Sequence, residues 1–256
     1  MHLHKELDPR DYFRQRLVRV PKVLRRFRNR PSFSGKRVLD IGSGYCALSV
    51  YAAEQGAASV IGVDLDRHKV EVARNILRND YPKFNEHVRY ECRDVEELDS
   101  EQFDLVVSMA VFEHVLDPLS TLQSINRRLS EKGTIHLGIG PLYRAPWGDH
   151  KRIKAPGYRL FPWAHLCFSE KWLVERRNRM GDVEIEKILD LGLNCLRFDD
   201  YVRAFQESGL GIREFRINVH ETPGITPLLN GLRRLPGLKD LLTVNMYVTL
   251  SNIRAE

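Results

Sequence analysis

The chain has 256 residues, of which 43% are hydrophobic and 29% charged, and a formal net charge of +6. This composition is typical of a globular protein, and the length suits one large domain or one domain with an insertion. No apolar run reaches the roughly 18 residues of a membrane-spanning helix, and no apolar signal segment stands near the N-terminus. We therefore expect a cytoplasmic protein, with peripheral membrane contact as an option. Four cysteines without CxxC spacing favour reduced thiols over a disulfide framework or a zinc site.

The first 35 residues form a basic segment. Between Arg10 and Arg37 there are eleven basic residues and one acid, Asp11, so this stretch carries +10 and the rest of the chain −4. Apolar residues at helical spacing predict a helical arm over residues 1–35, and Pro21 predicts two short helices rather than one. The basic face is either a solvated surface or attracts phosphate, from an anionic membrane, a lipid-linked pyrophosphate or a nucleic acid.

Residues 36–140 alternate short apolar segments with amphipathic ones, which predicts a doubly wound parallel sheet. Strands are expected at residues 37–41, 59–64, 88–92, 103–109, 133–138, 212–219 and 244–252. Helices are expected between them at residues 47–55, 67–79, 118–129 and 198–208.

The segment from residue 140 to about residue 195 is too long for a simple connection between two elements. It is rich in aromatic residues, histidine and proline, and it contains the stretches Trp147-Gly148-Asp149-His150 and Pro162-Trp163-Ala164-His165. Ligands of open parallel sheets bind beyond the carboxyl ends of the strands, where this segment would emerge. We interpret it as a substrate lid.

A glycine turn follows the first expected strand, in the run Val38-Leu39-Asp40-Ile41-Gly42-Ser43-Gly44. Glycines allow a close approach of the backbone to a ligand, and the helix that follows begins with unpaired amides. Asp64, at the end of the second strand, lies where a nucleotide would present its ribose hydroxyls. Gly42-x-Gly44-x-x-Ala47 also matches the fingerprint of nicotinamide dinucleotides, but Asp40 is unfavourable for a pyrophosphate. A ligand with a ribose and a cationic or amine-bearing tail fits better.

These features, with segments further along the chain, resemble the class I S-adenosylmethionine-dependent methyltransferases. The further segments are Arg93-Asp94-Val95, the strand at residues 103–109, Val-Phe-Glu-His-Val-Leu-Asp-Pro at residues 111–118, and the turn at residues 129–135. Together they cover residues 36–140 in the family's order. Cys46 stands where the family often has a third glycine. The resemblance implies a Rossmann-like seven-stranded sheet with its last strand antiparallel, in a methyltransferase domain over residues 36–256 with the lid inserted after the fifth strand.

The resemblance also implies an S-adenosyl-L-methionine cofactor and assigns residues to it. Asp40, Gly42 and Gly44 would contact the methionine end, and Asp64 the ribose hydroxyls. Asp94 and Val95 would contact the adenine, and Leu65 and Met109 complete the set of cofactor-binding residues. A simpler interpretation is that Asp64 and Asp94 only cap the helices after them.

Methyl transfer to a hydroxyl requires a base or a metal, and histidine is the natural base near neutral pH. His114, beside Glu113 after the fourth strand, is therefore a candidate catalytic residue. The lid residues Asp149, His150 and His165 are further candidates, although polar groups of this kind also stabilise insertions. Those three could also hold a divalent metal, but their spacing is irregular, and no metal is assigned.

The sequence indicates the methyl acceptor less clearly than it indicates the cofactor. The lid stretches resemble Gly-x-His and Pro-Trp-x-His motifs of bacterial glycan-type methyltransferases, so we expect O-methylation of a sugar or glycan hydroxyl, free or lipid-linked. The segment at residues 111–118 also resembles methyltransferases of quinones, phenols and other small molecules, which is the second hypothesis. RNA methylation is third, and a nucleic-acid partner is not expected because no nucleic-acid module is present. A non-catalytic binding protein of the same fold is the last alternative.

Overall fold

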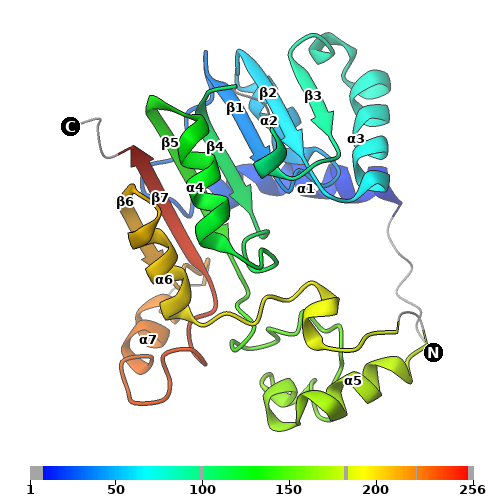
Figure 1. Ribbon diagram of the computed structural model, residues 1–256, viewed down its shortest axis with the longest axis vertical. Helices are drawn as coiled ribbons and strands as arrows, with labels where there is room; N and C mark the ends of the chain where they lie inside the picture. Colours follow the sequence, from blue (N-terminus) through cyan, green and yellow to red (C-terminus); the bar gives the residue numbers. More distant parts are fainter. Residues whose placement is uncertain (1–7, 99–100, 182–183, 223, 253–256) are drawn as a thin grey trace.

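The computed structural model describes residues 8–98, 101–181, 184–222 and 224–252. Its centre is a seven-stranded sheet with the strand order β3-β2-β1-β4-β5-β7-β6 (Figure 1). The strands are β1 (Arg37–Ile41), β2 (Ser59–Val63), β3 (Val88–Glu91), β4 (Phe103–Met109), β5 (Leu129–Ile139), β6 (Leu210–Ile217) and β7 (Met246–Asn252). The first five are parallel, and β7 is antiparallel to both of its neighbours. The predicted sheet, with its antiparallel last strand, is confirmed.

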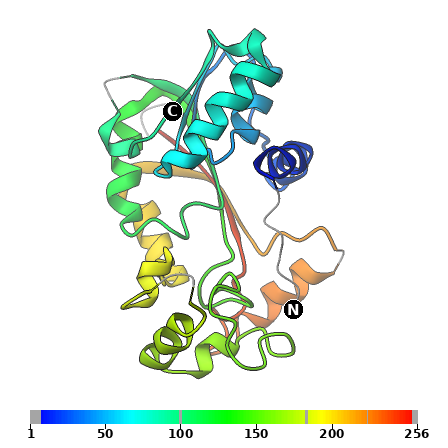
Figure 2. The ribbon, with the colours of Figure 1, turned by 90° about the vertical axis from the view of Figure 1, so that its right-hand side faces the viewer.

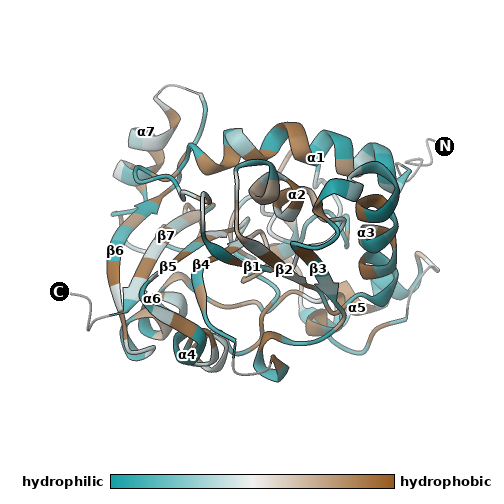
Figure 3. Ribbon diagram, turned by 90° about the horizontal axis from the view of Figure 1, so that it is seen from above, coloured by the Kyte–Doolittle hydropathy of each residue, from teal (hydrophilic) through white to brown (hydrophobic). Residues whose placement is uncertain are grey.

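Helices cover both faces of the sheet (Figures 2 and 3). One face carries α1 (Pro9–Leu24), α2 (Ala47–Glu54) and α3 (Arg67–Asp80), and the other carries α4 (Pro118–Arg128) and α6 (Phe198–Glu207). Successive side chains of a strand point to opposite faces. Accordingly, Val38 of β1 packs in the core beneath α1–α3, and Leu39 packs in the core beneath α4 and α6. The remaining helical segments are α5 (Glu170–Asn178), α7 (Ile225–Leu232), and the short η1 (Pro82–Phe84), η2 (Val95–Glu97), η3 (Ala164–Cys167) and η4 (Ile188–Leu191).

In the described part of the basic N-terminal arm, residues 8–35, there is one continuous helix, α1, so the prediction that Pro21 divides the arm into two short helices was wrong. Pro21 lies in the last turn of α1, and the helix ends three residues later at Leu24. A proline so close to the end disturbs few helical hydrogen bonds. Phe13, Val20 and Leu24 are buried in the core shared with α2 and α3, so tertiary packing on both sides of Pro21 holds the helix together.

The segment that we interpret as a lid, described over residues 140–181 and 184–195, lies beyond the carboxyl ends of the parallel strands (Figure 1). Its role as a lid stays a prediction. The segment contains η3, α5 and η4 and has a small apolar core of its own, which includes Ile153, Leu173 and Leu193. Across the described parts of the chain, no helix has both the length and the apolar character needed to cross a membrane.

Candidate functional site

The glycine turn joins β1 to α2 through three residues in the left-handed region of backbone space. Gly42 has φ 70°, Gly44 has φ 52° and Cys46 has φ 70°. Thus Cys46, in place of a third glycine, keeps the backbone conformation that glycine favours. A Cβ at Gly42 would lie 2.2 Å from Cγ2 of Val111, so this glycine permits packing within the protein. A Cβ at Gly44 would meet no atom within 4 Å, so Gly44 is the position where the backbone is open to a ligand.

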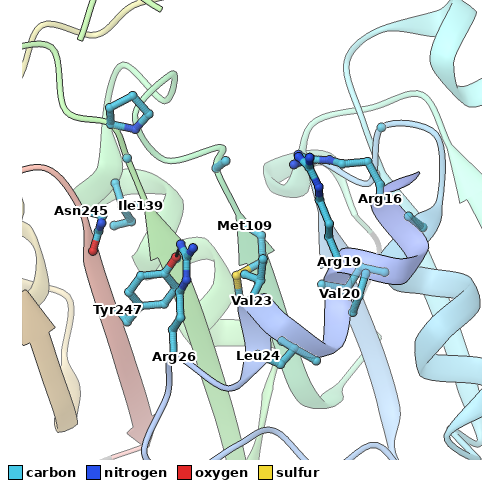
Figure 4. Close-up of a pocket in the computed structure, with 18 of the residues that line it drawn as sticks. Arg16, Arg19, Val20, Val23, Leu24, Arg26, Met109, Ile139, Asn245 and Tyr247 are labelled. Carbon is cyan, nitrogen blue, oxygen red and sulfur yellow. Dashed lines mark hydrogen bonds between the residues drawn. The ribbon is translucent and has the colours of Figure 1, made fainter. Parts of the chain in front are cut away.

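A cavity of about 520 Å³ opens beside this turn, within the range of small-molecule sites (Figure 4). Five parts of the chain line it: α1 and the residues after it, the glycine turn with the start of α2, the ends of β4 and β5, the lid, and β7 with the residues before it. Lining residues include Arg16, Arg19, Val23, Arg26, Asp40, Gly42, Ser43, Gly44, Met109, Ala110, Gly140, Pro141, Trp147, Asn245 and Tyr247.

Asp40 is a buried carboxylate at the glycine-turn side of the cavity. Ser49 Oγ donates a 2.6 Å hydrogen bond to its Oδ2. Burial, assisted by the nearby charge of Asp64, raises the pKa of Asp40 to about 7 although the Ser49 hydrogen bond opposes the shift. Ser43 Oγ is also buried and has no hydrogen-bond partner within the described residues. A ligand with an ammonium group and a hydrogen-bonding tail would satisfy both groups.

Asp64 fixes the glycine turn. Its Oδ2 accepts a 2.9 Å hydrogen bond from the amide of Gly44, and its Oδ1 accepts one of 2.9 Å from the amide of Asp66. Each oxygen keeps a second lone pair that could accept a ribose hydroxyl. Leu65, the next residue, is 71% exposed and offers an apolar surface at the same edge.

Asp94 and Val95 are placed differently. Asp94 caps η2 by accepting a 2.9 Å hydrogen bond from the amide of Glu96, so its predicted capping role is observed. The side chain of Val95 is buried in the core, which leaves its backbone as the group available to a ligand. Neither residue lines the cavity described above. Their contact with adenine stays a prediction.

Glu113, His114 and His150 form a cluster at the lid. One ligand atom from each lies within 4.8 Å of the others, and the two imidazole rings have centroids 5.1 Å apart. His114 Nδ1 donates to the carbonyl of Gly192, and His150 Nε2 donates to that of Pro141 at 3.1 Å. The second nitrogen of each neutral ring is therefore an acceptor. Burial lowers the pKa of both histidines, so both are neutral near pH 7.

Glu113 is the member of this cluster that sequence reasoning noted only as a neighbour. It is 3% exposed, and neither carboxyl oxygen has a hydrogen-bond partner among the described residues. Burial raises its pKa to about 8, so the carboxyl is mostly protonated at neutral pH. Once ionised, the Glu113 carboxylate together with the two imidazoles would be a donor set that suits a divalent cation.

Asp149 and His165 are part of the internal structure of the lid. Buried Asp149 accepts hydrogen bonds from the amides of Lys151 (3.2 Å) and Ile153 (3.4 Å). His165 is 2% exposed, and its Nε2 bonds the carbonyl of Tyr143 at 2.7 Å. Of the three residues considered as a metal set, the structure brings only His150 into a potential cation cluster, with partners from outside the lid.

The arginines of α1 and of the residues just after it are the part of the site that the sequence did not indicate. Arg16, Arg19 and Arg26 line the cavity, whereas the basic arm was expected to face solvent or an external phosphate. The sequence did contain one indication of this arrangement: the spacing of Arg16, Arg19, Val23 and Arg26 places them on one face of a helix. Nothing in the sequence alone shows what that face would meet.

Residues 39–137 match the methyltransferase domain family. The chain is 36% identical over 100 residues to a ubiquinone biosynthesis O-methyltransferase of Coxiella burnetii, a match covering 38% of this chain and 41% of that protein. It is 35% identical over 111 residues to the protein of that name from Haemophilus ducreyi, covering 40% and 44%. The chain thus spans about two fifths of the length of the curated relatives it matches.

Solved structures extend the similarity to the whole fold. An S-adenosylmethionine-dependent methyltransferase from Mesorhizobium loti superposes with a TM-score of 0.58 at 20% identity, covering 91% of this chain and 97% of that one. Geranyl diphosphate C-methyltransferase from Streptomyces coelicolor gives a TM-score of 0.55 at 14% identity, covering 94% and 78%. At these identities the similarity establishes the fold alone.

Proposed function

We propose that this chain, whose residues 39–137 match the methyltransferase domain family and whose fold resembles that of S-adenosylmethionine-dependent methyltransferases, transfers a methyl group to a hydroxyl of a small-molecule acceptor. The observation that carries the proposal is the cavity that runs from the glycine turn to the lid and α1. Its volume is that of a small-molecule site, and part of its wall is formed by the carboxyl ends of the parallel strands β1, β4 and β5, where ligands of such sheets bind.

The residues at the glycine turn fit the cofactor. Asp40 can pair with the methionine ammonium, Ser43 Oγ and the open backbone at Gly44 can receive the amino-acid tail, and Asp64 retains lone pairs for the ribose hydroxyls. Met109 lines the same cavity at the end of β4. Bound S-adenosylmethionine would supply an electrophilic methyl group.

Curated relatives named as ubiquinone biosynthesis O-methyltransferases favour a phenol- or quinone-type acceptor over the sugar or glycan expected from the lid motifs. The geometry of the lid also supports a phenol- or quinone-type acceptor before a sugar or glycan. Trp147 lines the cavity, but Asp149 and His165, expected to contact sugar hydroxyls, are occupied within the lid. A glycan therefore becomes the second candidate, supported by Trp147 alone.

His114 is our candidate for the base that removes the hydroxyl proton. Its ring is neutral at neutral pH, and the Gly192 carbonyl fixes the proton on Nδ1, which leaves Nε2 as the acceptor. His150 is its neighbour and the alternative base. Neither histidine lines the cavity, although His150 bonds the carbonyl of Pro141, which does. We therefore propose that the lid segment moves when the acceptor binds, so that one of these rings reaches it.

The experiment combines binding with a transfer screen. Calorimetry with S-adenosylhomocysteine should show binding that Asp64→Ala weakens at least tenfold, because the substitution removes the ribose acceptor and the bond to the Gly44 amide. Asp66→Ala, a neighbouring carboxylate that caps α3, is the matched control and should change affinity less than about threefold. Labelled-methyl transfer is then measured with catechols, sugars and RNA. Absence of binding to the wild-type protein would refute the function, and transfer to RNA alone would refute the acceptor class.

A further inference from the structure

The cavity is unevenly charged. Of the residues that line it, Asp40 is the single acid, and it stands beside the glycine turn. Three guanidinium groups, from Arg16, Arg19 and Arg26, line the α1 side. Of the described carboxylates, none lies within ion-pair distance of Arg16 or Arg19, and Arg16 instead stands over the ring of Tyr12, 5.5 Å from its centroid. The α1 side of the cavity is therefore positive with little compensation.

The guanidinium groups occupy two separate places (Figure 4). The guanidinium groups of Arg16 and Arg19 lie side by side. Arg26 lies on the other side of Val23 and Met109, next to Tyr247. A single carboxylate, such as that of the cofactor's methionine, can occupy one of these two places.

Arg26 is held in position by β7. Its Nη1 donates a 2.7 Å hydrogen bond to Tyr247 Oη, and its guanidinium carbon lies 5.6 Å from the centre of the Tyr247 ring. Its one acidic contact within the described residues is Glu221 at 3.4 Å, a side chain that is 67% exposed and so screened by solvent. Arg26 Nε is buried and has no partner among those residues. No buried carboxylate of the described residues therefore balances the charge of Arg26, which an anion in the cavity could do.

This place is far from the methionine end of the cofactor. In the sheet, β4 and β5 lie between β1, which leads into the glycine turn, and β7, which carries Tyr247. Three steps of about 4.8 Å each separate the two strands by roughly 14 Å. A methionine seated at Asp40 and Gly44 leaves Arg26 for a different ligand.

We propose, on the basis of the methyltransferase function above, that the acceptor carries an anionic group, a carboxylate or a phosphate, which binds Arg26 at the β7 end of the cavity. The planar guanidinium can bind either group through two hydrogen bonds, and Tyr247 holds it in place. Val23 and Met109 between the two basic places provide an apolar contact for the body of the acceptor. Arg26 thus determines acceptor specificity.

The test uses matched pairs that differ in charge, titrated by calorimetry into the protein saturated with S-adenosylhomocysteine. The pairs are 3,4-dihydroxybenzoate with 3,4-dihydroxybenzamide, glucuronate with glucose, and geranyl diphosphate with geraniol. We expect the anionic member of at least one pair to bind at least tenfold more tightly than its neutral partner. Arg26→Gln should abolish that preference and leave the affinity for S-adenosylhomocysteine within about twofold. The matched control is Arg25→Gln, the adjacent, exposed arginine that does not line the cavity.

Three outcomes overturn the proposal: equal or absent binding of both members of every pair, a charge preference that survives Arg26→Gln, or a loss of S-adenosylhomocysteine affinity in Arg26→Gln matching that of the acceptor. The last would assign Arg26 to the cofactor carboxylate. If the wild-type protein does not bind S-adenosylhomocysteine, the proposed function fails. The same pairs are then titrated into the protein without S-adenosylhomocysteine, and this titration still shows whether Arg26 binds an anionic group. The size of the charge preference in the two carboxylate pairs, compared with that in the diphosphate pair, shows whether the site prefers a carboxylate or a phosphate.

Discussion

The ionisation of Asp40 should control cofactor affinity near neutral pH. Its carboxyl has a pKa of about 7 in the free protein because burial disfavours the charge. Only the ionised form can pair with the methionine ammonium. The ionised fraction is about one half at pH 7 and about one tenth at pH 6, so the affinity for S-adenosylhomocysteine should fall about fivefold over that unit and about tenfold over each further unit of acidification.

The assay is calorimetric titration of S-adenosylhomocysteine at pH 5.5 to 8.5 and constant ionic strength. Asp40→Asn should bind weakly across the range and without this slope, since its side chain keeps the shape but not the charge. The control ligand, 5′-methylthioadenosine, lacks the amino-acid tail and should bind wild-type protein with little pH dependence. A flat wild-type profile, or the same slope in Asp40→Asn, would refute the assignment of Asp40 to the ammonium.

Two other predictions concern stability and need no ligand. Gly42→Ala places a Cβ 2.2 Å from Val111 at a left-handed φ, so it should destabilise the protein by roughly 1–3 kcal/mol in urea unfolding. Val111→Ala in the same background should recover part of that loss, and no recovery would contradict the steric explanation. Glu113→Gln should gain stability relative to wild type as pH rises. Because the folded-state pKa of Glu113 is raised from 4.5 to about 8, the benefit of the protonated carboxyl is complete below about pH 4.5 and is lost by about pH 8. The free energy of unfolding of Glu113→Gln minus that of wild type should grow by up to about 1.4 kcal/mol per pH unit, to a total of a few kcal/mol. An equal difference at pH 5 and pH 8 would contradict this prediction.

The sheet could be predicted closely because each central strand is an apolar run between polar turns. The expected bounds of β1 and β4 match those observed, and α2 and α3 differ from expectation by one residue. β5 begins earlier than expected, at Leu129, where its pairing with β4 shifts register. The glycine turn could also be predicted, because its glycines stand next to an apolar strand in the sequence. Its contacts with Asp64 and Val111, which are distant in sequence, became visible only in the structure. Cys46 adopts the left-handed conformation without being glycine, and its side chain is completely buried.

The lid and the arm were harder to predict because their geometry depends on distant contacts. Trp147, His150 and Lys151 all have positive φ, an arrangement of non-glycine residues that sequence pattern does not reveal. This turn brings His150 to His114, while His165, similar in sequence context, is turned into the lid core. The two similar stretches, each ending in a histidine, therefore place that histidine in different environments.

The position of α1 also determines which experiments can separate its functions. Phe13, Val20 and Leu24 belong to the core, so removal of the first 30 residues would unfold part of that core as well as remove charge. Loss of membrane or acceptor binding in such a deletion would therefore carry no information on the arginines. Single substitutions avoid this problem because the cavity-facing Arg26 and the outward-facing Arg25 are adjacent in sequence and equal in charge. A membrane surface, which senses overall charge, should respond to both substitutions alike. An anionic acceptor within the cavity should respond to Arg26 alone.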